Sequence, residues 1–164
     1  MTTNDTAFAG SIPALYDRHP GPVLFEPYAA DMVRRFARLR EGAILETASG
    51  TGIVTQQLAS ALPAAVRIVA TDLNQPMLDF AAAKQPHASR IEWRQADALA
   101  LPFEDQSFDA VACQFGAMFF PDRPAAYAEA RRVLRPDGTL VLAIWDSLAG
   151  NDFARVLTSA VAEH

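Results

Sequence analysis

Residues 44–52, Ile-Leu-Glu-Thr-Ala-Ser-Gly-Thr-Gly, decide how the rest of this sequence is interpreted. A short apolar segment, predicted as a strand over Ala43–Thr47, runs into a turn of small residues and then into a helical pattern from about Thr51 to Leu62. Glycine permits a positive φ in such a turn, and small side chains let a ligand approach the backbone closely. The stretch therefore predicts a strand–turn–helix unit. Its turn either binds a ligand or is only a tight connection between the strand and the helix.

The same alternation continues along the chain. Parallel strands joined through helices make right-handed crossovers, so this order predicts one α/β domain with a Rossmann-like parallel sheet flanked by helices. A turn is predicted at Pro136-Asp137-Gly138. The further strands are predicted over Val66–Thr71, Arg90–Arg94, Phe108–Phe115 and Thr139–Trp145, and the further helices over Pro27–Arg40, from Asn74 onward, over Pro124–Leu134 and from about Asp152.

Composition and charge restrict the class of protein. A chain of 164 residues that is 51% hydrophobic and 20% charged suits a single globular domain. The formal net charge of -5 argues against electrostatic attraction to nucleic acid or to anionic membranes. Cys113 is the only cysteine, so neither an intrachain disulfide nor a metal site is expected. Without a leader pattern or a membrane-length apolar run, the sequence predicts a soluble cytoplasmic protein that binds neither nucleic acid nor membrane.

The N-terminal part of the sequence lacks a clear period. Prolines at positions 13, 20 and 22 predict an irregular segment over Met1–Gly21. Residues 1–25 are interpreted as an N-terminal segment, with a lid role expected for it, ahead of a core over residues 26–164. His19 in this segment is the best candidate for a general base, although a histidine of a surface loop is the simpler interpretation.

Acidic residues lie at the ends of three predicted strands, where open α/β sheets bind their ligands. Asp72 lies 20 residues after Gly52, and a carboxylate there can accept hydrogen bonds from two ribose hydroxyls. Asp97 follows the third strand, where it can accept from the exocyclic amine of adenine. Either acid could instead cap a loop or a helix. The order Ala48-x-Gly50-x-Gly52 fits the dinucleotide fingerprint G-x-G-x-x-G poorly.

Four motifs follow one another in this sequence. They are an acidic, small-residue turn at residues 46–52, an acid at Asp72, the segment Asp-Ala-Leu-Ala-Leu-Pro-Phe-Glu-Asp-Gln-Ser-Phe-Asp at residues 97–109, and Arg-Arg-Val-Leu-Arg-Pro-Asp-Gly-Thr-Leu at residues 131–140. Together they resemble the class I S-adenosylmethionine (SAM)-dependent methyltransferases, in particular the type 11 group, which acts on small molecules and includes quinone-biosynthesis enzymes. The resemblance covers about Glu26 to Trp145 and implies SAM as cofactor and the strand order 3-2-1-4-5.

The resemblance also implies a role for individual residues. Glu46 would lie near the SAM amino group, and Asp72 would hold the ribose hydroxyls. Gln114 and Phe115 would lie beneath the methionine portion and face the methyl acceptor. Leu73 and Met77 would flank adenine, Asp97 or Ala98 would bind its edge, and Tyr16 would cover the cofactor. The full set expected to bind SAM is Tyr16, Glu46, Thr47, Ala48, Ser49, Gly50, Gly52, Asp72, Leu73, Met77, Asp97, Ala98, Gln114 and Phe115.

Two features depart from the family pattern. Ala48 replaces the first glycine of the turn, and its methyl group is expected to weaken SAM binding at most. The family usually continues past the fifth strand with a helix and an antiparallel hairpin, whereas this sequence stops at His164, inside that helix. The core is therefore expected to be C-terminally incomplete. Its fifth strand would be an apolar edge through which the chain forms a homo-oligomer, unless the natural protein is longer.

The expected function is methyl transfer from SAM to a small-molecule acceptor. One alternative is a non-catalytic SAM-binding fragment or interaction protein. The other is an NAD(P)-dependent oxidoreductase on the same sheet, but this would require a third glycine at the fingerprint spacing and a Tyr/Lys or similar hydride-transfer pair, which the sequence lacks.

Overall fold

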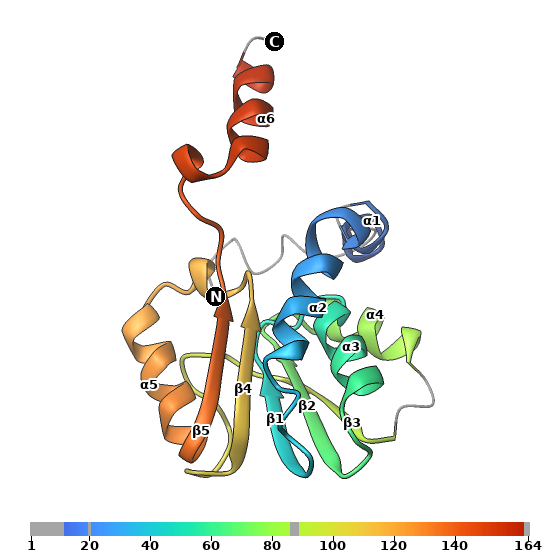
Figure 1. Ribbon diagram of the computed structural model, residues 1–164, viewed down its shortest axis with the longest axis vertical. Helices are drawn as coiled ribbons and strands as arrows, with labels where there is room; N and C mark the ends of the chain where they lie inside the picture. The colour runs from blue at the N-terminus through green and yellow to red at the C-terminus, as the bar shows by residue number, and fades with distance from the viewer. Residues whose placement is uncertain (1–11, 20, 86–88, 163–164) are drawn as a thin grey trace.

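The structure is a computed structural model that describes residues 12–19, 21–85 and 89–162. Its described strands form one five-stranded sheet in the order β3-β2-β1-β4-β5, and every pairing between neighbours is parallel (Figure 1). The predicted fold class and strand order are therefore confirmed. The strands are β1 (Gly42–Glu46), β2 (Val66–Asp72), β3 (Ile91–Gln95), β4 (Phe108–Gln114) and β5 (Leu134–Ala143).

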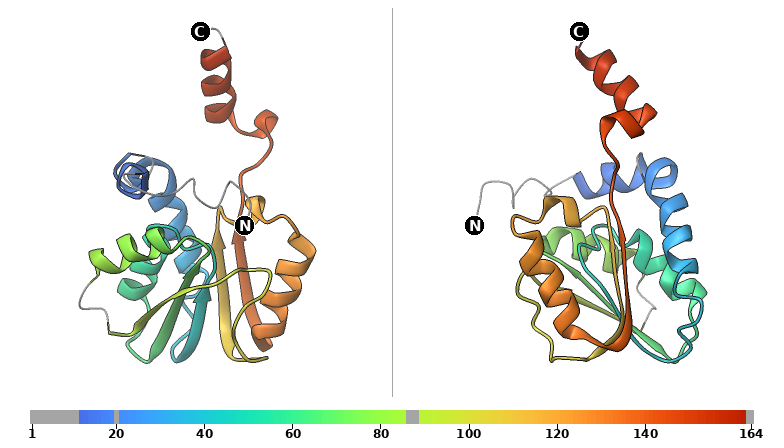
Figure 2. Two further views of the ribbon diagram at one scale, coloured as in Figure 1. Left: turned by 180° about the vertical axis from the view of Figure 1, so that it is seen from behind. Right: turned by 60° about the vertical axis from the view of Figure 1, so that its left-hand side comes forward.

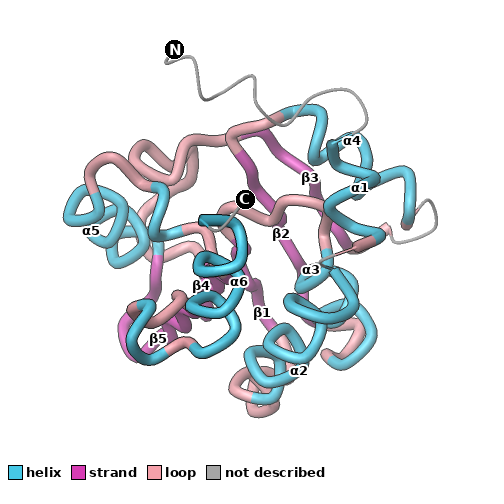
Figure 3. Tube along the Cα trace, turned by 90° about the horizontal axis from the view of Figure 1, so that it is seen from above, coloured by secondary structure: helices cyan, strands magenta, loops and turns pink. Residues whose placement is uncertain are grey.

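Helices cover both faces of the sheet, which is why the central strands β1, β2 and β4 are almost wholly buried and apolar. Helices α2 (Glu26–Arg34), α3 (Ile53–Ala61) and α4 (Gln75–Lys84) lie on one side, and α5 (Arg123–Val133) lies on the other (Figure 3). Met32 of α2 and Leu58 of α3 pack on Ile68 in the first core. The second core joins Val133 of α5 to Phe108 and to Leu101 of the long β3–β4 loop.

The N-terminal segment is more regular than its prolines predict. Where the sequence indicates an irregular stretch, the structure has helix α1 (Ile12–Arg18) and a π-helix (Gly21–Phe25) that leads into α2. Pro13 is accommodated because a first-turn residue needs no backbone N–H. Lys84 Nζ of α4 lies 2.5 Å from Asp17 Oδ1, and this half-buried ion pair fastens α1 to the core. Helix α1 lies at the end of the molecule to which the strands point (Figure 2).

Helix α2 is shorter than predicted. It ends at Arg34 rather than Arg40, because the next residues make i→i+3 bonds, such as Phe36 N–H to the Val33 carbonyl oxygen at 3.0 Å. Phe36 still packs in the first core beside Met32 and Val33, the face that the helical period predicts, and only 3% of it is exposed.

The turn predicted at Pro136–Gly138 is present, but it lies inside β5. Pairing with β4 passes from Phe108↔Leu134 directly to Ala110↔Thr139, so the register shifts and residues 135–138 form a bulge opposite Asp109. Asp137 carries the positive φ of that bulge, at 65°. The regular part of the strand starts at Thr139, as predicted, and it ends at Ala143, two residues before the predicted Trp145.

Beyond β5 the chain leaves the sheet. A 3-10 helix (Leu148–Gly150) and helix α6 (Asp152–Ala162) stand clear of the body in every view (Figures 1 and 2). Consequently, β5 is an edge of the described sheet, and its Leu140 and Leu142 are over one-third exposed. In the described residues, no helix is long and apolar enough to span a bilayer.

Candidate functional site

A small cavity lies at the carboxyl ends of β1 and β4, and the end of β2 lies next to it. Glu46, the last residue of β1, lies opposite Ala70 of β2 and Ala112 of β4, so the residues at the three strand ends are close together. The cavity has a volume of about 50 Å³, and backbone from the turn after β1 forms much of its wall. Its lining residues are Phe25, Glu46, Ala48, Ser49, Gly50, Thr51, Ile53, Val54, Gln114 and Phe115.

The turn after β1 is built from left-handed residues. Ala48, Gly50 and Gly52 have φ values of 53°, 54° and 77°. A Cβ on Gly52 would lie 2.9 Å from the Trp93 ring and 3.0 Å from the Ala81 methyl carbon, so this glycine allows α3 to pack closely. A Cβ on Gly50 would meet nothing within 4 Å. Gly50 therefore leaves space on the side where a ligand can approach the backbone.

Ala48 occupies the position where the family has glycine. A Cβ on Gly116, just after β4, would lie only 2.3 Å from the Ala48 Cβ. The absence of a side chain at Gly116 thus makes room for the extra methyl group of Ala48. The left-handed backbone of an alanine still costs about 1–2 kcal/mol relative to glycine. The expected effect of Ala48 on SAM binding stays a prediction.

Asp72 is held in place by the backbone around it. Its Oδ2 accepts a hydrogen bond from Gly50 N–H at 2.8 Å, and its Oδ1 accepts one from Asn74 N–H at 2.8 Å. Burial raises the pKa of Asp72, and the N–H groups of Asn74 and Gly50 oppose that rise. The carboxylate therefore ties the end of β2 to the turn after β1 and lies next to the space left open by Gly50.

Glu46 is the most buried acid of the site, with 2% of its surface exposed. Its Oε2 accepts a hydrogen bond from Thr55 Oγ1 of α3 at 2.5 Å. Burial raises the pKa of Glu46 to about 8, while the Thr55 hydroxyl lowers it and the charge of Asp72 raises it. A carboxyl group with this pKa is mostly protonated at neutral pH, and a cationic group bound beside it would lower the pKa and favour the ionised form.

Replacing Glu46 with glutamine is expected to reduce the pH dependence of stability. The pKa of Glu46 is about 8 in the fold against an ordinary value of 4.5, so between these values the folded chain keeps a proton that the unfolded chain has lost. The free energy of unfolding therefore falls as pH rises through this window, by at most about 1.4 kcal/mol per pH unit for this group. Glutamine does not titrate, so Glu46→Gln should be more stable than the wild type near the upper end of the window.

Denaturant titrations across this pH range measure the effect. If wild type and Glu46→Gln lose stability in parallel as the pH rises, Glu46 is already ionised in the fold.

The residues predicted to bind adenine lie beside β2 and β3. Leu73 is 45% exposed just after β2, whereas Met77 of α4 is buried with 4% exposed. Asp97 is exposed, and its Oδ1 accepts a hydrogen bond from Leu99 N–H at 2.9 Å. This contact is that of a turn cap, the simpler of the two interpretations of Asp97. Ala98 is half-buried in the same turn.

Three other predicted residues have different outcomes. Cys113 is buried in the middle of β4. His19 is exposed at the end of α1, which favours its interpretation as a surface residue. Tyr16 belongs to α1, but its side chain lies outside the part of the chain that is described.

Phe115 is the centre of an aromatic cluster that the sequence interpretation missed. Its ring stacks on Trp145, with centroids 4.1 Å apart and planes 1° from parallel. Tyr28 meets both rings edge-on, and Phe25 lies 5.9 Å from Phe115. These four aromatic residues come from the π-helix, from α2 and from the residues that follow β4 and β5. Sequence spacing gave no signal for the cluster, because the residues that form it are far apart in the chain.

Arg132 was also missed. It joins the two segments whose sequences resemble the family most. Its Nη1 donates to the Phe103 carbonyl and to Asp105 Oδ1, both at 2.8 Å, and its Nη2 donates to the Leu101 carbonyl at 2.9 Å. Its Nε donates to Glu129 Oε1 at 2.7 Å. Arg132 therefore fixes the β3–β4 loop against α5, away from the cavity, and its role is structural.

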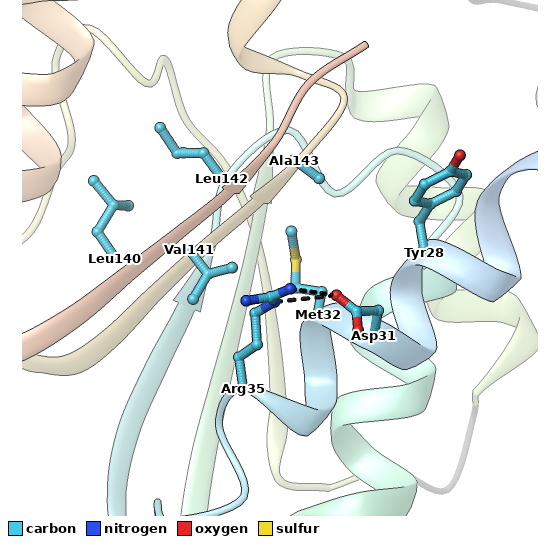
Figure 4. A pocket seen from close by; sticks show the side chains of 8 residues that line it. All are labelled: Tyr28, Asp31, Met32, Arg35, Leu140, Val141, Leu142 and Ala143. Carbon is cyan, nitrogen blue, oxygen red and sulfur yellow. Dashed lines mark hydrogen bonds and ion pairs between the residues drawn. The ribbon is translucent and has the colours of Figure 1, made fainter. Parts of the chain in front are cut away.

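A larger cavity, of about 340 Å³, lies between α2 and β5 (Figure 4). Its two charged side chains, Asp31 and Arg35, face each other, with Arg35 Nη2 2.8 Å from Asp31 Oδ2. The rest of the wall is Tyr28, Met32 and residues 140–143 of the edge strand. No acidic residue from the end of a strand lines this cavity. Despite its size, it is a poorer candidate for a cofactor site than the cavity around Glu46.

Among the described residues there is no group of three or more His, Cys, Asp or Glu side chains that could hold a metal ion. Ser49 Oγ and Gln114 Oε1 are buried in the wall of the small cavity and have no hydrogen-bond partner among the described residues. Such atoms are costly to leave unpaired, so a ligand or water is expected to satisfy them.

A parallel sheet of this order, with helices on both faces and polar residues at the ends of β1, β2 and β4, is the fold of the class I SAM-dependent methyltransferases. Two solved structures share it. The YcgJ protein from Bacillus subtilis has a TM-score of 0.64 and 26% identity, over 70% of this chain and 48% of that one. A SAM-dependent methyltransferase from Aquifex aeolicus has a TM-score of 0.71 and 19% identity, over 82% of this chain and 73% of that one.

The chain belongs to the type 11 methyltransferase family, whose model, described as a methyltransferase domain, matches residues 45–142. A ubiquinone/menaquinone biosynthesis C-methyltransferase from Geotalea uraniireducens is 38% identical over 117 residues, which are 66% of this chain and 50% of that protein. A demethylmenaquinone methyltransferase from Deinococcus radiodurans is 43% identical over 100 residues, 60% of this chain and 41% of that protein. The chain thus spans about half the length of these relatives or less.

Proposed function

We propose that this chain binds SAM at the ends of β1, β2 and β4 and transfers its methyl group to a small-molecule acceptor. The observation that carries the proposal is the cavity around Glu46, with its open backbone at Gly50 and its unpartnered polar atoms, in a chain that belongs to a methyltransferase family. The residues present fit SAM, since the cofactor offers hydroxyl and ammonium donors to an acidic, partly apolar site.

The protein contributes mainly position and exclusion of water. When bound, SAM supplies a sulfonium whose methyl group is already activated. Asp72 would accept hydrogen bonds from the ribose hydroxyls, and Glu46 would lie at the ammonium end. Leu73 and Met77 would flank adenine, with Asp97 or the Ala98 amide at its edge. An ion pair between Asp17 and Lys84 fastens α1 to α4, and we propose that α1 covers the cofactor through Tyr16.

The acceptor that we propose is a planar or aromatic small molecule. Two observations support this choice. The cluster of Phe25, Tyr28, Phe115 and Trp145 lies beside the cavity, and aromatic faces favour offset or edge contacts with another ring. The names of the relatives also point to quinone methylation. No residue of this chain is proposed as a general base.

Calorimetry with SAM, S-adenosylhomocysteine and NAD tests the cofactor. We expect both sulfur compounds to bind and NAD to bind much more weakly. Tight NAD binding without SAM binding would favour the oxidoreductase alternative and overturn the proposal. SAM binding without turnover of any quinone-type acceptor would support the non-catalytic alternative.

We further propose that β5 is a contact between two copies of the chain. The edge presents Leu140 and Leu142, and open strand edges readily pair with another chain. Light scattering over a wide concentration range provides the test, and a stable monomer throughout would exclude the contact. A cytoplasmic location is part of the proposal, since the free thiol of Cys113 suits a reducing compartment. Cell fractionation would check it.

A further inference from the structure

The groove between α2 and β5, which is the larger cavity described above, has an apolar floor. Val141 and Ala143 of β5 point toward Met32 of α2 and pack against the first core (Figure 4). Both residues are only half-buried, and Tyr28 at the end of the wall is 49% exposed. Because β5 is an edge of the described sheet, no further strand of the described chain closes the groove. A helix can therefore reach its apolar floor from outside.

Helix α6 is amphipathic and stands clear of the body (Figures 1 and 2). At 3.6 residues per turn, Val156, Ala160 and Val161 share one half of its surface, and Arg155 and Ser159 lie on the other half. The two valines are 60% and 69% exposed. A helix of 11 residues is marginal in water and gains most of its stability from packing of an apolar face. The apolar half of α6 therefore requires a partner surface.

The connection between β5 and α6 directs the helix away from the groove of its own chain. Trp145, two residues after β5, is held in the aromatic cluster. The next residues form a hydrogen-bonded turn, in which Ser147 N–H donates to Asp146 Oδ1 at 2.6 Å and Gly150 N–H donates to the Ser147 carbonyl oxygen at 3.0 Å. Because these contacts hold the connection, α6 lies beyond the end of the strand and does not fold back along it. Its own groove is left open to another copy of the chain.

We propose that α6 of a second copy of this chain lies in the groove between α2 and β5, so that two copies exchange their C-terminal helices. The valines of α6 cover Val141 and Ala143 of the other copy, as amphipathic helices commonly bind apolar grooves. Exchange of an identical element is a low-cost route to a dimer. The proposal adds a second contact to the one proposed at the edge of β5, and it does not depend on methyl transfer.

The charges of the two surfaces are complementary. The groove carries Asp31 and Arg35, and the first turn of α6 carries Asp152 and Arg155, each pair with its charged atoms 2.8 Å apart. All four side chains are about half exposed or more, so each acid can turn to a base of the other copy. Exposed ion pairs add little to affinity. The charges therefore orient the helix, and the apolar contact holds it.

The first test is the oligomeric state of the full chain, measured by sedimentation velocity over a range of concentrations. Val156→Asp places a charge on the face of α6 that the dimer buries. Thr158→Asp is the matched control, because it adds the same charge to the same helix at an exposed position about 200° around the axis. We expect a dimer for the wild type, a dissociation constant at least roughly 10-fold higher for Val156→Asp, and one within about twofold of wild type for Thr158→Asp.

Equal dissociation constants for Val156→Asp and Thr158→Asp would overturn the inference and leave the contact at β5 standing. A wild-type chain that is monomeric at every concentration would overturn both contacts.

The second test identifies the surface that α6 covers and the chain that supplies it. The double variant Val141→Cys/Val156→Cys is oxidised and separated by non-reducing electrophoresis, and the linked peptides are identified by mass spectrometry. Cys113 stays in place, since it is buried. We expect a covalent dimer that is linked between positions 141 and 156 of different chains, because a disulfide forms only where the two Cα atoms approach closely. A disulfide within one chain, or no link between these positions, would overturn the inference.

Discussion

Replacing Asp72 with alanine is expected to weaken binding of S-adenosylhomocysteine by roughly 10- to 100-fold, from two lost hydrogen bonds between ribose hydroxyls and a carboxylate. The carboxylate is already aimed by its bonds to Gly50 N–H and Asn74 N–H, both 2.8 Å long, so little ordering is needed when the ligand binds. Titration calorimetry measures the affinity, and circular dichroism checks that the variant is folded.

Two further variants make the result specific to Asp72. Asp72→Asn keeps one acceptor oxygen and should give an intermediate loss. Asp97→Ala removes an exposed carboxylate whose recorded hydrogen bond is a turn cap to Leu99, so it should cost less than Asp72→Ala. Equal affinities of the wild type and Asp72→Ala would show that the ribose does not bind at the end of β2.

The second large effect is expected at Gly52. Gly52→Ala should reduce the free energy of unfolding by about 2–4 kcal/mol, from left-handed strain of an alanine together with overpacking. The added methyl carbon would lie 2.9 Å from Trp93 and 3.0 Å from Ala81, and neither the ring nor the helix can move away cheaply. Thermal or denaturant unfolding measures the loss.

Gly50→Ala is the matched control for Gly52→Ala. Its φ of 54° is also left-handed, but an added methyl carbon would meet nothing within 4 Å. Stability should therefore fall by only about 1–2 kcal/mol. Since the methyl group points into the space proposed for the ligand, cofactor affinity should fall much more than stability. If the two variants have the same stability, Gly52 does not serve close packing.

The residues at the ends of the strands could be placed at one edge of the sheet from the sequence alone. Glu46, Asp72 and Gln114 were expected at one edge because parallel strands place their carboxyl ends together, and the observed register confirms that β1, β2 and β4 do so. The bounds of elements were less well predicted. Helix α2 ends at Arg34 and passes into turns with i→i+3 bonds, and α1 formed where prolines favoured an irregular segment.

The sequence by itself determined the α/β class, the order of the elements and the acids of the site, because these depend on hydrophobic period and on small or acidic residues at fixed local spacing. Only the tertiary structure decided how the side chains act. The raised pKa of Glu46 comes mainly from burial, and the orientation of the Gln114 amide comes from its hydrogen bond to a carbonyl oxygen 89 positions away in the chain. The stacking of Phe115 on Trp145 likewise depends on the adjacency of β4 and β5. Such properties arise from contacts between segments that are distant in sequence, so no local pattern encodes them.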